Sequence, residues 1–242
     1  MILRKIEDKT LLEGHSIILK NKRHHSHRST CEFDLRTVYP KNNRQELVLN
    51  SKKNIVITGY AGTGKSFLAS YMGYKDILSN KLDKLVYIRS AVPTRNIGFL
   101  PGTDKEKIEV YEAPYIDIAS ELFGRGDSYD ILKKKSLVHF SSTSFVRGIN
   151  LRDAFIIVDE VQNMSYHELD SVLTRLNDNC RIAFCGDLRQ ADLFKNGMEK
   201  FYRVLKAMPE EFDFIEFGKE DIVRSDLVKK YIITKDLVLN EL

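Results

Sequence analysis

Short runs of apolar residues alternate with amphipathic segments from residue 54 onward. The apolar runs are rich in β-branched residues and have the length of buried strands, whereas the segments between them repeat apolar residues at helical spacing. Strands that alternate with helices predict an α/β domain of three layers with a mostly parallel sheet. Strands are predicted at residues 54–58, 85–89, 137–140, 155–159, 182–185 and 212–216, and helices at 66–78, 115–123, 166–176 and 197–208.

The stretch 90–135 interrupts this alternation. Three prolines in it predict a long functional loop, with one helix near its end at residues 115–123. Tyr111 and Tyr115 lie in this stretch, where they either stack on nucleobases or pack against the core, and packing is the more common role of a tyrosine beside a proline. After the last predicted strand, apolar periodicity from Ile222 onward predicts a C-terminal helix.

The composition is that of a globular protein. The chain has 242 residues, 43% hydrophobic and 30% charged, which excludes disordered and collagen-like classes and suffices for a core without disulfides. Three cysteines, an odd number without a C-x-x-C pair, indicate a reducing compartment. Neither a signal-peptide pattern nor a run of 18 apolar residues is present, so the protein is expected to be cytoplasmic and free of the membrane.

Positive charge is concentrated near the N-terminus. Residues 1–53 hold 12 basic and 6 acidic residues, a net charge of +6 within a chain of +4, which leaves −2 for the remainder. Four of the 6 histidines lie within 15–27, and with Cys31 they could form a metal site. Their spacing matches no common zinc pattern and favours a solvated basic loop. We expect a basic segment over 1–37 and the globular domain over 38–242.

A phosphate-binding motif follows the first predicted strand and opens the first predicted helix. Residues 59–66 match G-x-x-x-x-G-K-[ST] at every fixed position. Glycines let backbone N–H groups surround an anion, and the helix N-terminus adds its positive end. Lys65 is expected to reach the β- and γ-phosphates of a nucleotide, and the Ser66 hydroxyl to hold Mg²⁺. The predicted nucleotide-binding residues of this motif are Gly59, Tyr60, Ala61, Gly62, Thr63, Gly64, Lys65, Ser66 and Phe67.

Two later strands end in polar residues at the edge where α/β sheets bind ligands. Asp159 is expected to bind Mg²⁺ together with Ser66, and Glu160 to accept a proton from the attacking water. Alternatively, Glu160 only begins the next loop. Beyond the following strand, Gln190 is expected to orient water beside the γ-phosphate, unless this segment is a plain turn in which Asp187 caps a short helix.

These motifs together resemble the PhoH family of phosphate-starvation-type P-loop ATPases, whose domain is similar to the first motor domain of superfamily 1 helicases. The resemblance extends over residues 38–233, and it implies a three-layer P-loop NTPase fold of the RecA-like kind, so that 38–242 would be a PhoH-like ATPase domain. Val161 replaces the usual alanine of D-E-A-Q-N. The matching segments are Pro40–Gln45, Arg89–Pro93, Ile97–Gly102 with Lys105, Phe145–Gly148, Asp159–Asn163 and Asp221–Arg224.

The resemblance also implies roles for two residues outside the phosphate motif. Gln45 would lie at the adenine edge, since an amide can read the N6 donor and N7 acceptor of adenine. Arg224 would be an arginine finger, acting in trans from a neighbouring subunit because the chain has length for one motor domain only. Alternatively, Arg224 is a surface residue that pairs with Asp221 or Asp226.

We therefore expect a Mg²⁺-dependent ATPase that acts on RNA or single-stranded DNA in a helicase-like manner, as a homo-oligomer such as a ring. The nucleic-acid substrate rests on the resemblance and on the basic N-terminal segment. A second hypothesis belongs to another class of protein: a switch or assembly protein whose ATP state controls a protein partner without nucleic-acid remodelling.

Overall fold

The computed structural model describes residues 34–90, 104–146, 151–188 and 198–240. A six-stranded sheet forms its centre, with the strand order β3-β2-β4-β5-β1-β6. Every neighbouring pair in this sheet is parallel, so the predicted α/β architecture is confirmed. The strands are β1 (Asn54–Gly59), β2 (Lys84–Arg89), β3 (Val138–Ser142), β4 (Ala154–Asp159), β5 (Cys180–Gly186) and β6 (Phe212–Phe217).

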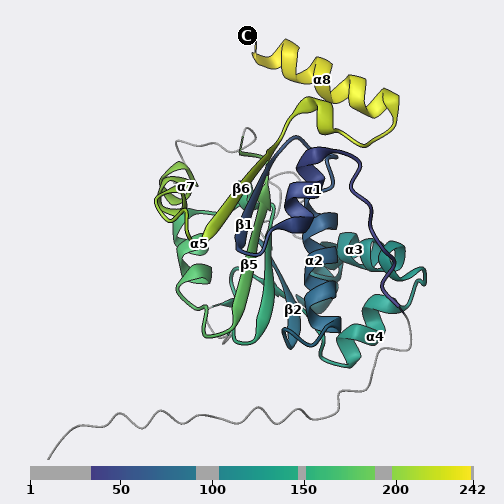
Figure 1. Ribbon diagram of the computed structural model, residues 1–242, viewed down its shortest axis with the longest axis vertical. Coiled ribbons are helices and arrows are strands. Elements are labelled where there is room, and N and C mark those ends of the chain that lie inside the picture. The colour runs from purple at the N-terminus through teal and green to yellow at the C-terminus, as the bar shows by residue number, and fades with distance from the viewer. Residues whose placement is uncertain (1–33, 91–103, 147–150, 189–197, 241–242) are drawn as a thin grey trace, which may run out of the picture. The chain divides into compact units, whose positions relative to one another are not determined.

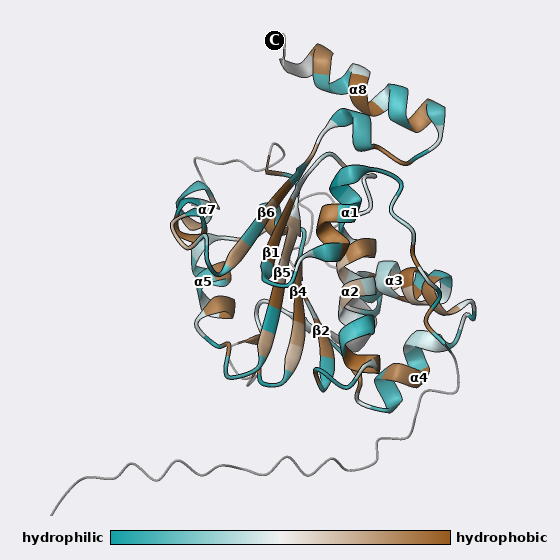
Figure 2. Cartoon of the chain, in the orientation of Figure 1, coloured by the Kyte–Doolittle hydropathy of each residue, from teal (hydrophilic) through white to brown (hydrophobic). Residues whose placement is uncertain are grey.

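Helices cover both faces of the sheet (Figure 1). On one face lie α1 (Asn43–Asn50), α2 (Lys65–Leu78), α3 (Asp104–Phe123) and α4 (Ser128–Lys134). On the other face lie α5 (Tyr166–Leu173) and α7 (Met198–Lys206). Each face has its own apolar core, and apolar residues dominate the strands between them in Figure 2. This is the three-layer arrangement that the alternation of strands and helices predicts.

The six predicted strands and the helix predicted at 66–78 agree with the structure to within two residues at each end, but α1, α3 and α4 on the same face as α2 do not follow the prediction. The stretch predicted as a long loop holds the 20-residue α3, which contains Pro114, and then α4. Proline normally breaks a helix, but buried contacts hold this one. The Glu112 carboxylate accepts hydrogen bonds from the Lys133 ammonium at 2.6 and 2.7 Å, and Tyr115 is fully buried. From residue 104 onward the prediction of a loop with one short helix is therefore wrong, whereas 91–103 lie outside the described residues.

The C-terminal helix α8 (Asp226–Asn240) begins later than its apolar periodicity suggests. Ile222 is buried ahead of the helix, whereas Leu227 and Tyr231 within the helix are 78% and 66% exposed. Figure 2 shows apolar residues along α8. Among the helices that the structure describes, none has the length and apolar character needed to cross a membrane.

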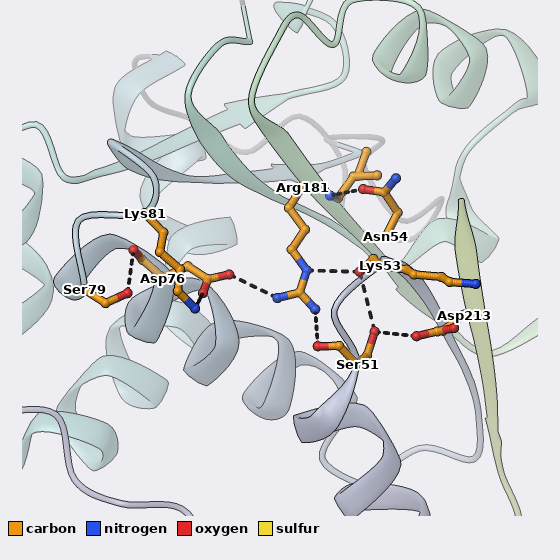
Figure 3. A network of polar contacts seen from close by, with 9 residues as sticks. Ser51, Lys53, Asn54, Asp76, Ser79, Lys81, Arg181 and Asp213 are labelled. Atoms are coloured by element: carbon orange, nitrogen blue, oxygen red, sulfur yellow. Dashed lines mark hydrogen bonds and ion pairs between the residues drawn. The ribbon is translucent and has the colours of Figure 1, made fainter. Parts of the chain in front are cut away.

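A polar network joins the amino-terminal ends of the strands to α2 (Figure 3). The Arg181 guanidinium at the start of β5 donates to the Asp76 carboxylate at 3.0 Å and to the carbonyl oxygens of Ser51 and Lys53 at 2.8 and 3.0 Å. The Ser51 hydroxyl in turn donates to the Asp213 carboxylate at 2.8 Å. These groups bond one another and tie β5, α2 and β6 together at this edge.

Candidate nucleotide-binding site

The loop between β1 and α2 lies at the carboxyl edge of the sheet and carries the phosphate motif. Gly62 has a φ of 77°, and a Cβ atom there would lie 2.6 Å from Cγ of Arg224. A side chain is therefore disfavoured at this position both by backbone conformation and by close approach. Thr63 is buried and donates to the carbonyl oxygen of Tyr60 at 2.8 Å, which fixes the loop from within. α2 begins directly after this loop, so the N–H groups of its first turn, which have no partner within a helix, are available to bind an anion there.

Lys65 is the first residue of α2, and its side chain reaches back to the loop. Its ammonium donates to the carbonyl oxygens of Gly59 and Tyr60 at 2.7 and 2.8 Å. Burial lowers the pKa of this lysine, while the carboxylates of Asp187, Glu160 and Asp159 act in the opposite direction. An ammonium has three donors, so the two bonds to the loop leave one for an anion.

Asp159, at the end of β4, faces the loop. Its Oδ1 accepts hydrogen bonds from the Ser66 hydroxyl at 2.9 Å and from the backbone N–H of Glu160 at 3.1 Å. Its Oδ2 accepts a hydrogen bond from the Tyr115 hydroxyl at 3.0 Å. Burial raises the pKa of Asp159, and the neighbouring Glu160 carboxylate raises it further, whereas Ser66, Tyr115 and Arg89 lower it. The predicted pair of metal ligands, Ser66 and Asp159, is thus in direct contact.

Glu160 follows in a left-handed backbone conformation, with a φ of 55°. Non-glycine residues held in this region are concentrated at functional sites. The Gln162 amide donates to the Glu160 carboxylate and accepts from the backbone N–H of Asp187 at 3.1 Å. A Cβ on Gly186 would lie 2.5 Å from Oε1 of Gln162, so the absence of a side chain there allows the ends of β4 and β5 to be linked. Arg89, at the end of β2, lies 4.0 Å from the Glu160 carboxylate.

Gln45 lies in α1 next to the phosphate loop. Its amide nitrogen donates to the carbonyl oxygen of Thr63 at 3.2 Å, and its amide oxygen accepts from the backbone N–H of Lys41 at 2.8 Å. Each end of the amide retains one further donor or acceptor for a ligand. Tyr39, which is 78% exposed, precedes α1 and lines the same cleft.

Arg224 lies against the phosphate loop of its own chain. The backbone N–H of Val223 donates to the carbonyl oxygen of Gly62 at 3.0 Å, and the Arg224 side chain contacts Gly62. The salt bridge of Asp221 goes to Arg44 of α1, at 2.6 Å, and not to Arg224. The structure therefore offers a role for Arg224 within the chain, while its action in trans stays a prediction.

Most of these residues line one cleft of about 900 Å³. It runs between the phosphate loop, the ends of β4 and β5, and Pro114, Asp117, Ile118 and Glu121 of α3. Two groups in the cleft could hold Mg²⁺. The hydroxyl of Ser66 and the carboxylate of Asp159 are oxygen ligands of the kind that this ion takes alongside nucleotide phosphates. The predicted site residues on the cleft wall are Gln45, Ala61, Gly62, Gly64, Lys65, Ser66, Phe67, Asp159, Glu160 and Arg224.

Some of the predicted residues and segments lie outside the described residues. Gln190 is one of them, although the end of β5 from which it follows lies between β1 and β4 and so adjoins the cleft. The segments 1–33, 91–103 and 147–150 are also outside. They contain the histidine cluster, the family motif Ile97–Gly102 and parts of the motifs Arg89–Pro93 and Phe145–Gly148.

Two residues have roles at the site that the sequence analysis does not predict. Gln162 belongs to the D-E-x-Q-N motif, but its link between two strand ends depends on the spatial order of β4 and β5. For Tyr115 the sequence suggests only packing or a platform for bases. It is fully buried, which contradicts base stacking, and its hydroxyl bonds Asp159. The spacing of 44 residues between them carries no signal in one sequence.

Comparisons with known proteins agree with this geometry. The chain is 33% identical over 199 residues to a PhoH-like protein of Bacillus subtilis (strain 168), covering 80% of this chain and 62% of that protein. It is 28% identical over 186 residues to protein PhoH of Escherichia coli (strain K12), covering 75% and 52%. The chain thus spans between about half and two thirds of the length of these relatives.

A solved structure shows the same fold. In one crystal form, the large terminase from a thermophilic bacteriophage matches this chain with a TM-score of 0.53 at 14% sequence identity. The match covers 79% of this chain and 48% of the terminase chain. A second crystal form of that terminase gives a TM-score of 0.51 at 13% identity. The model of the PhoH-like protein family matches residues 37–235. The chain therefore belongs to the PhoH family.

Proposed function

We propose that the chain binds ATP together with Mg²⁺ and hydrolyses it. The observation that carries the proposal is the contact between the Ser66 hydroxyl and Asp159 Oδ1, at 2.9 Å, in a cleft that also holds Lys65 and Glu160. Phosphate oxygens of the nucleotide would bind the loop N–H groups and Lys65, and Ser66 and Asp159 would hold the ion. A bound Mg²⁺ would neutralise charge that develops on the phosphates.

Glu160 is the proposed general base. Its carboxylate lines the cleft next to Asp159. Gln162 donates a hydrogen bond to this carboxylate and Arg89 lies 4.0 Å from it, so residues near the ends of β4 and β2 set its orientation. A base held in this way can accept a proton from water without first losing rotational freedom. Gln190 is proposed to orient the same water, and Gln45 to contact the adenine.

The proposed target of the ATPase is RNA or single-stranded DNA. It is supported by the net charge of +6 in residues 1–53 and by the resemblance to helicase motor domains. The test measures phosphate release from ATP with and without single-stranded RNA and DNA, from low to high salt. Heparin serves as the control polyanion. Stimulation by the nucleic acids, but not by heparin, that declines as salt rises supports the proposal.

The second candidate is an ATP-dependent switch that controls a protein partner. One observation favours it: several apolar side chains of α8, among them Leu227 and Tyr231, are exposed, while the Tyr60 hydroxyl of the phosphate loop donates to Asp236 of that helix. A change at the loop could thereby reach a protein-binding surface. Hydrolysis that is indifferent to nucleic acid at every salt concentration would favour this second function.

A further inference from the structure

Tyr115 brings a hydroxyl to the candidate metal site from outside all of its motifs. It lies in α3, its side chain has no exposed surface, and its hydroxyl donates to Oδ2 of Asp159 at 3.0 Å. A phenol hydroxyl is protonated at neutral pH and therefore donates this hydrogen bond. This bond joins a helix of the cleft wall to the carboxylate at the end of β4.

The two oxygens of Asp159 are held by different partners. Oδ1 accepts from the Ser66 hydroxyl and from the Glu160 backbone, and Oδ2 accepts from Tyr115. A buried carboxylate bonded at one oxygen only could still rotate about its χ2 torsion, which is a soft one. With both oxygens bonded, Oδ1 is directed to the Ser66 hydroxyl, which is the group expected to share the ion.

The donor is itself held in place. The Tyr115 ring stacks on the ring of Tyr87, with centroids 4.1 Å apart and an interplanar angle of 22°. Three residues earlier, Glu112 accepts hydrogen bonds from Lys133 and from the Tyr129 hydroxyl, at 3.2 Å for the latter. These contacts fix the rotation of α3 about its axis, so the hydroxyl of Tyr115 is a rigid reference point for the carboxylate.

We infer that Tyr115 is a positioning residue that orients Asp159 for the metal ion of the nucleotide site. The inference rests on the proposed function, because it assigns Asp159 to Mg²⁺. Hydrogen-bond partners of metal ligands orient those ligands, and their loss weakens metal binding. Tyr115 would therefore set how much Mg²⁺ is needed for nucleotide binding, without touching the nucleotide.

The test compares variants that each lose one buried hydroxyl of the same aromatic cluster. Tyr115→Phe keeps the ring and removes the donor to Asp159. Tyr87→Phe and Tyr129→Phe are the matched controls, since their hydroxyls donate to Tyr74 and Glu112. In both controls the rings and the ion pair between Glu112 and Lys133 remain, so the contacts that hold α3 are largely kept. Mg²⁺ is titrated into each protein with a fluorescent, non-hydrolysable ATP analogue, and nucleotide affinity is recorded together with the thermal unfolding midpoint.

Tyr115→Phe should raise the Mg²⁺ concentration at half-saturation by roughly 10- to 100-fold, the usual effect of losing a partner of a metal ligand. Affinity for the analogue in EDTA should stay that of the wild type. Both controls should keep the wild-type Mg²⁺ midpoint even where they lower the unfolding temperature.

Two results would overturn the inference: a wild-type midpoint in Tyr115→Phe, or an equal shift in all three variants, which would indicate general loosening of the cluster. A wild type that binds the analogue without regard to Mg²⁺ would instead remove the proposed function. Should Tyr115→Phe not fold, 3-fluorotyrosine in the wild type replaces it. The fluorine resonance of Tyr115 should move when Mg²⁺ joins the nucleotide, and an unmoved resonance would contradict the inference. Tyr→Phe variants of the other tyrosines, 11 in the chain with Tyr115, assign this resonance by elimination.

Discussion

The two edges of the sheet carry similar charged residues that serve different purposes. At the amino-terminal edge, Arg181 and Asp76 pair at 3.0 Å, and two further N–H groups of the arginine donate to the carbonyl oxygens of Ser51 and Lys53 (Figure 3). At the carboxyl edge, Lys65 and Asp159 line an open cleft. Charges that satisfy one another stabilise the fold, whereas charges that face a cleft can act on a ligand.

The difference shows in the lysine and the arginine. The Arg181 side chain is 15% exposed, and its guanidinium lies over the ring of Phe155 at 5.3 Å. Its charge is therefore paired with Asp76 and its guanidinium is packed against an aromatic ring, both within the protein. Lys65 donates its hydrogen bonds to neutral carbonyl oxygens, and burial lowers its pKa. A phosphate group would supply an opposite charge in direct contact with Lys65. The comparison predicts that substitutions at the carboxyl edge reduce turnover and that substitutions at the amino-terminal edge reduce stability.

Arg224→Ala should have the largest effect on turnover. The side chain lies against Gly62 in the cleft. If it is the arginine finger that the family resemblance implies, it stabilises charge on the γ-phosphoryl group, and its loss should reduce turnover by roughly 10³- to 10⁵-fold. Phosphate release at saturating ATP measures this effect, and ATP affinity should change far less. A decrease below about tenfold, far under the range for such fingers, would mean that Arg224 is not a finger in either arrangement.

Mixing experiments separate action within the chain from action in trans. If Arg224 acts on a neighbour, mixed assemblies of Arg224→Ala and Lys65→Ala chains should regain part of the lost activity, because one supplies the loop and the other the finger. If it acts at the loop of its own chain, as the contact with Gly62 in the structure allows, mixed assemblies should regain none. Size-exclusion chromatography must first show that the chains co-assemble.

Glu160→Gln should reduce turnover by roughly 10²-fold or more, the range for loss of a general base. The amide keeps the size of the carboxylate, so the contact with Gln162 can persist and binding of Mg²⁺ and ATP should be retained. Equilibrium binding checks that Mg²⁺ and ATP still bind, and single-turnover hydrolysis, measured on the same preparation, checks the loss of turnover. Wild-type turnover would assign the base elsewhere and leave Glu160 as the start of a loop.

Arg181→Met should have the smallest effect on turnover and a large effect on stability. It removes one partner of a mostly buried ion pair, which should lower the free energy of unfolding by about 3–5 kcal/mol. Arg203→Met is the control, because Arg203 pairs with Glu199 on an exposed helix surface and should cost less than about 1 kcal/mol. Urea unfolding measures both. Equal losses, or a catalytic defect in folded Arg181→Met, would break the contrast between the edges.

The sequence predicts the sheet well because its strands are continuous apolar runs, which are a local signal. The phosphate loop and Asp159 are equally local, since a strand followed by a fixed motif determines both. The prediction fails for α3, where Pro114 suggests a loop but the Glu112–Lys133 ion pair and the burial of Tyr115 hold a helix. Those contacts join distant parts of the chain, and one sequence contains no signal for them.

The same limit applies to three contacts at the site. Gln162 bonds the backbone of Asp187 because β4 and β5 are neighbours in the sheet, and Tyr115 reaches Asp159 because α3 packs on that face. Arg224 lies at the loop because β6 pairs with β1. Each depends on the spatial order of the strands, which the alternation of elements leaves open.

Hydrolysis of ATP with Mg²⁺ in the cleft at the carboxyl edge is the central claim. Phosphate release by the wild-type chain, in Mg²⁺ and in EDTA, beside Lys65→Ala protein with a matched unfolding midpoint, tests it most directly. We predict multiple turnovers in Mg²⁺, none in EDTA, and a decrease of roughly 10²-fold or more in the variant, the size expected for losing one group that stabilises developing charge. Turnover of Lys65→Ala at the wild-type rate, or no turnover by wild type that binds Mg²⁺ and ATP, would contradict the claim.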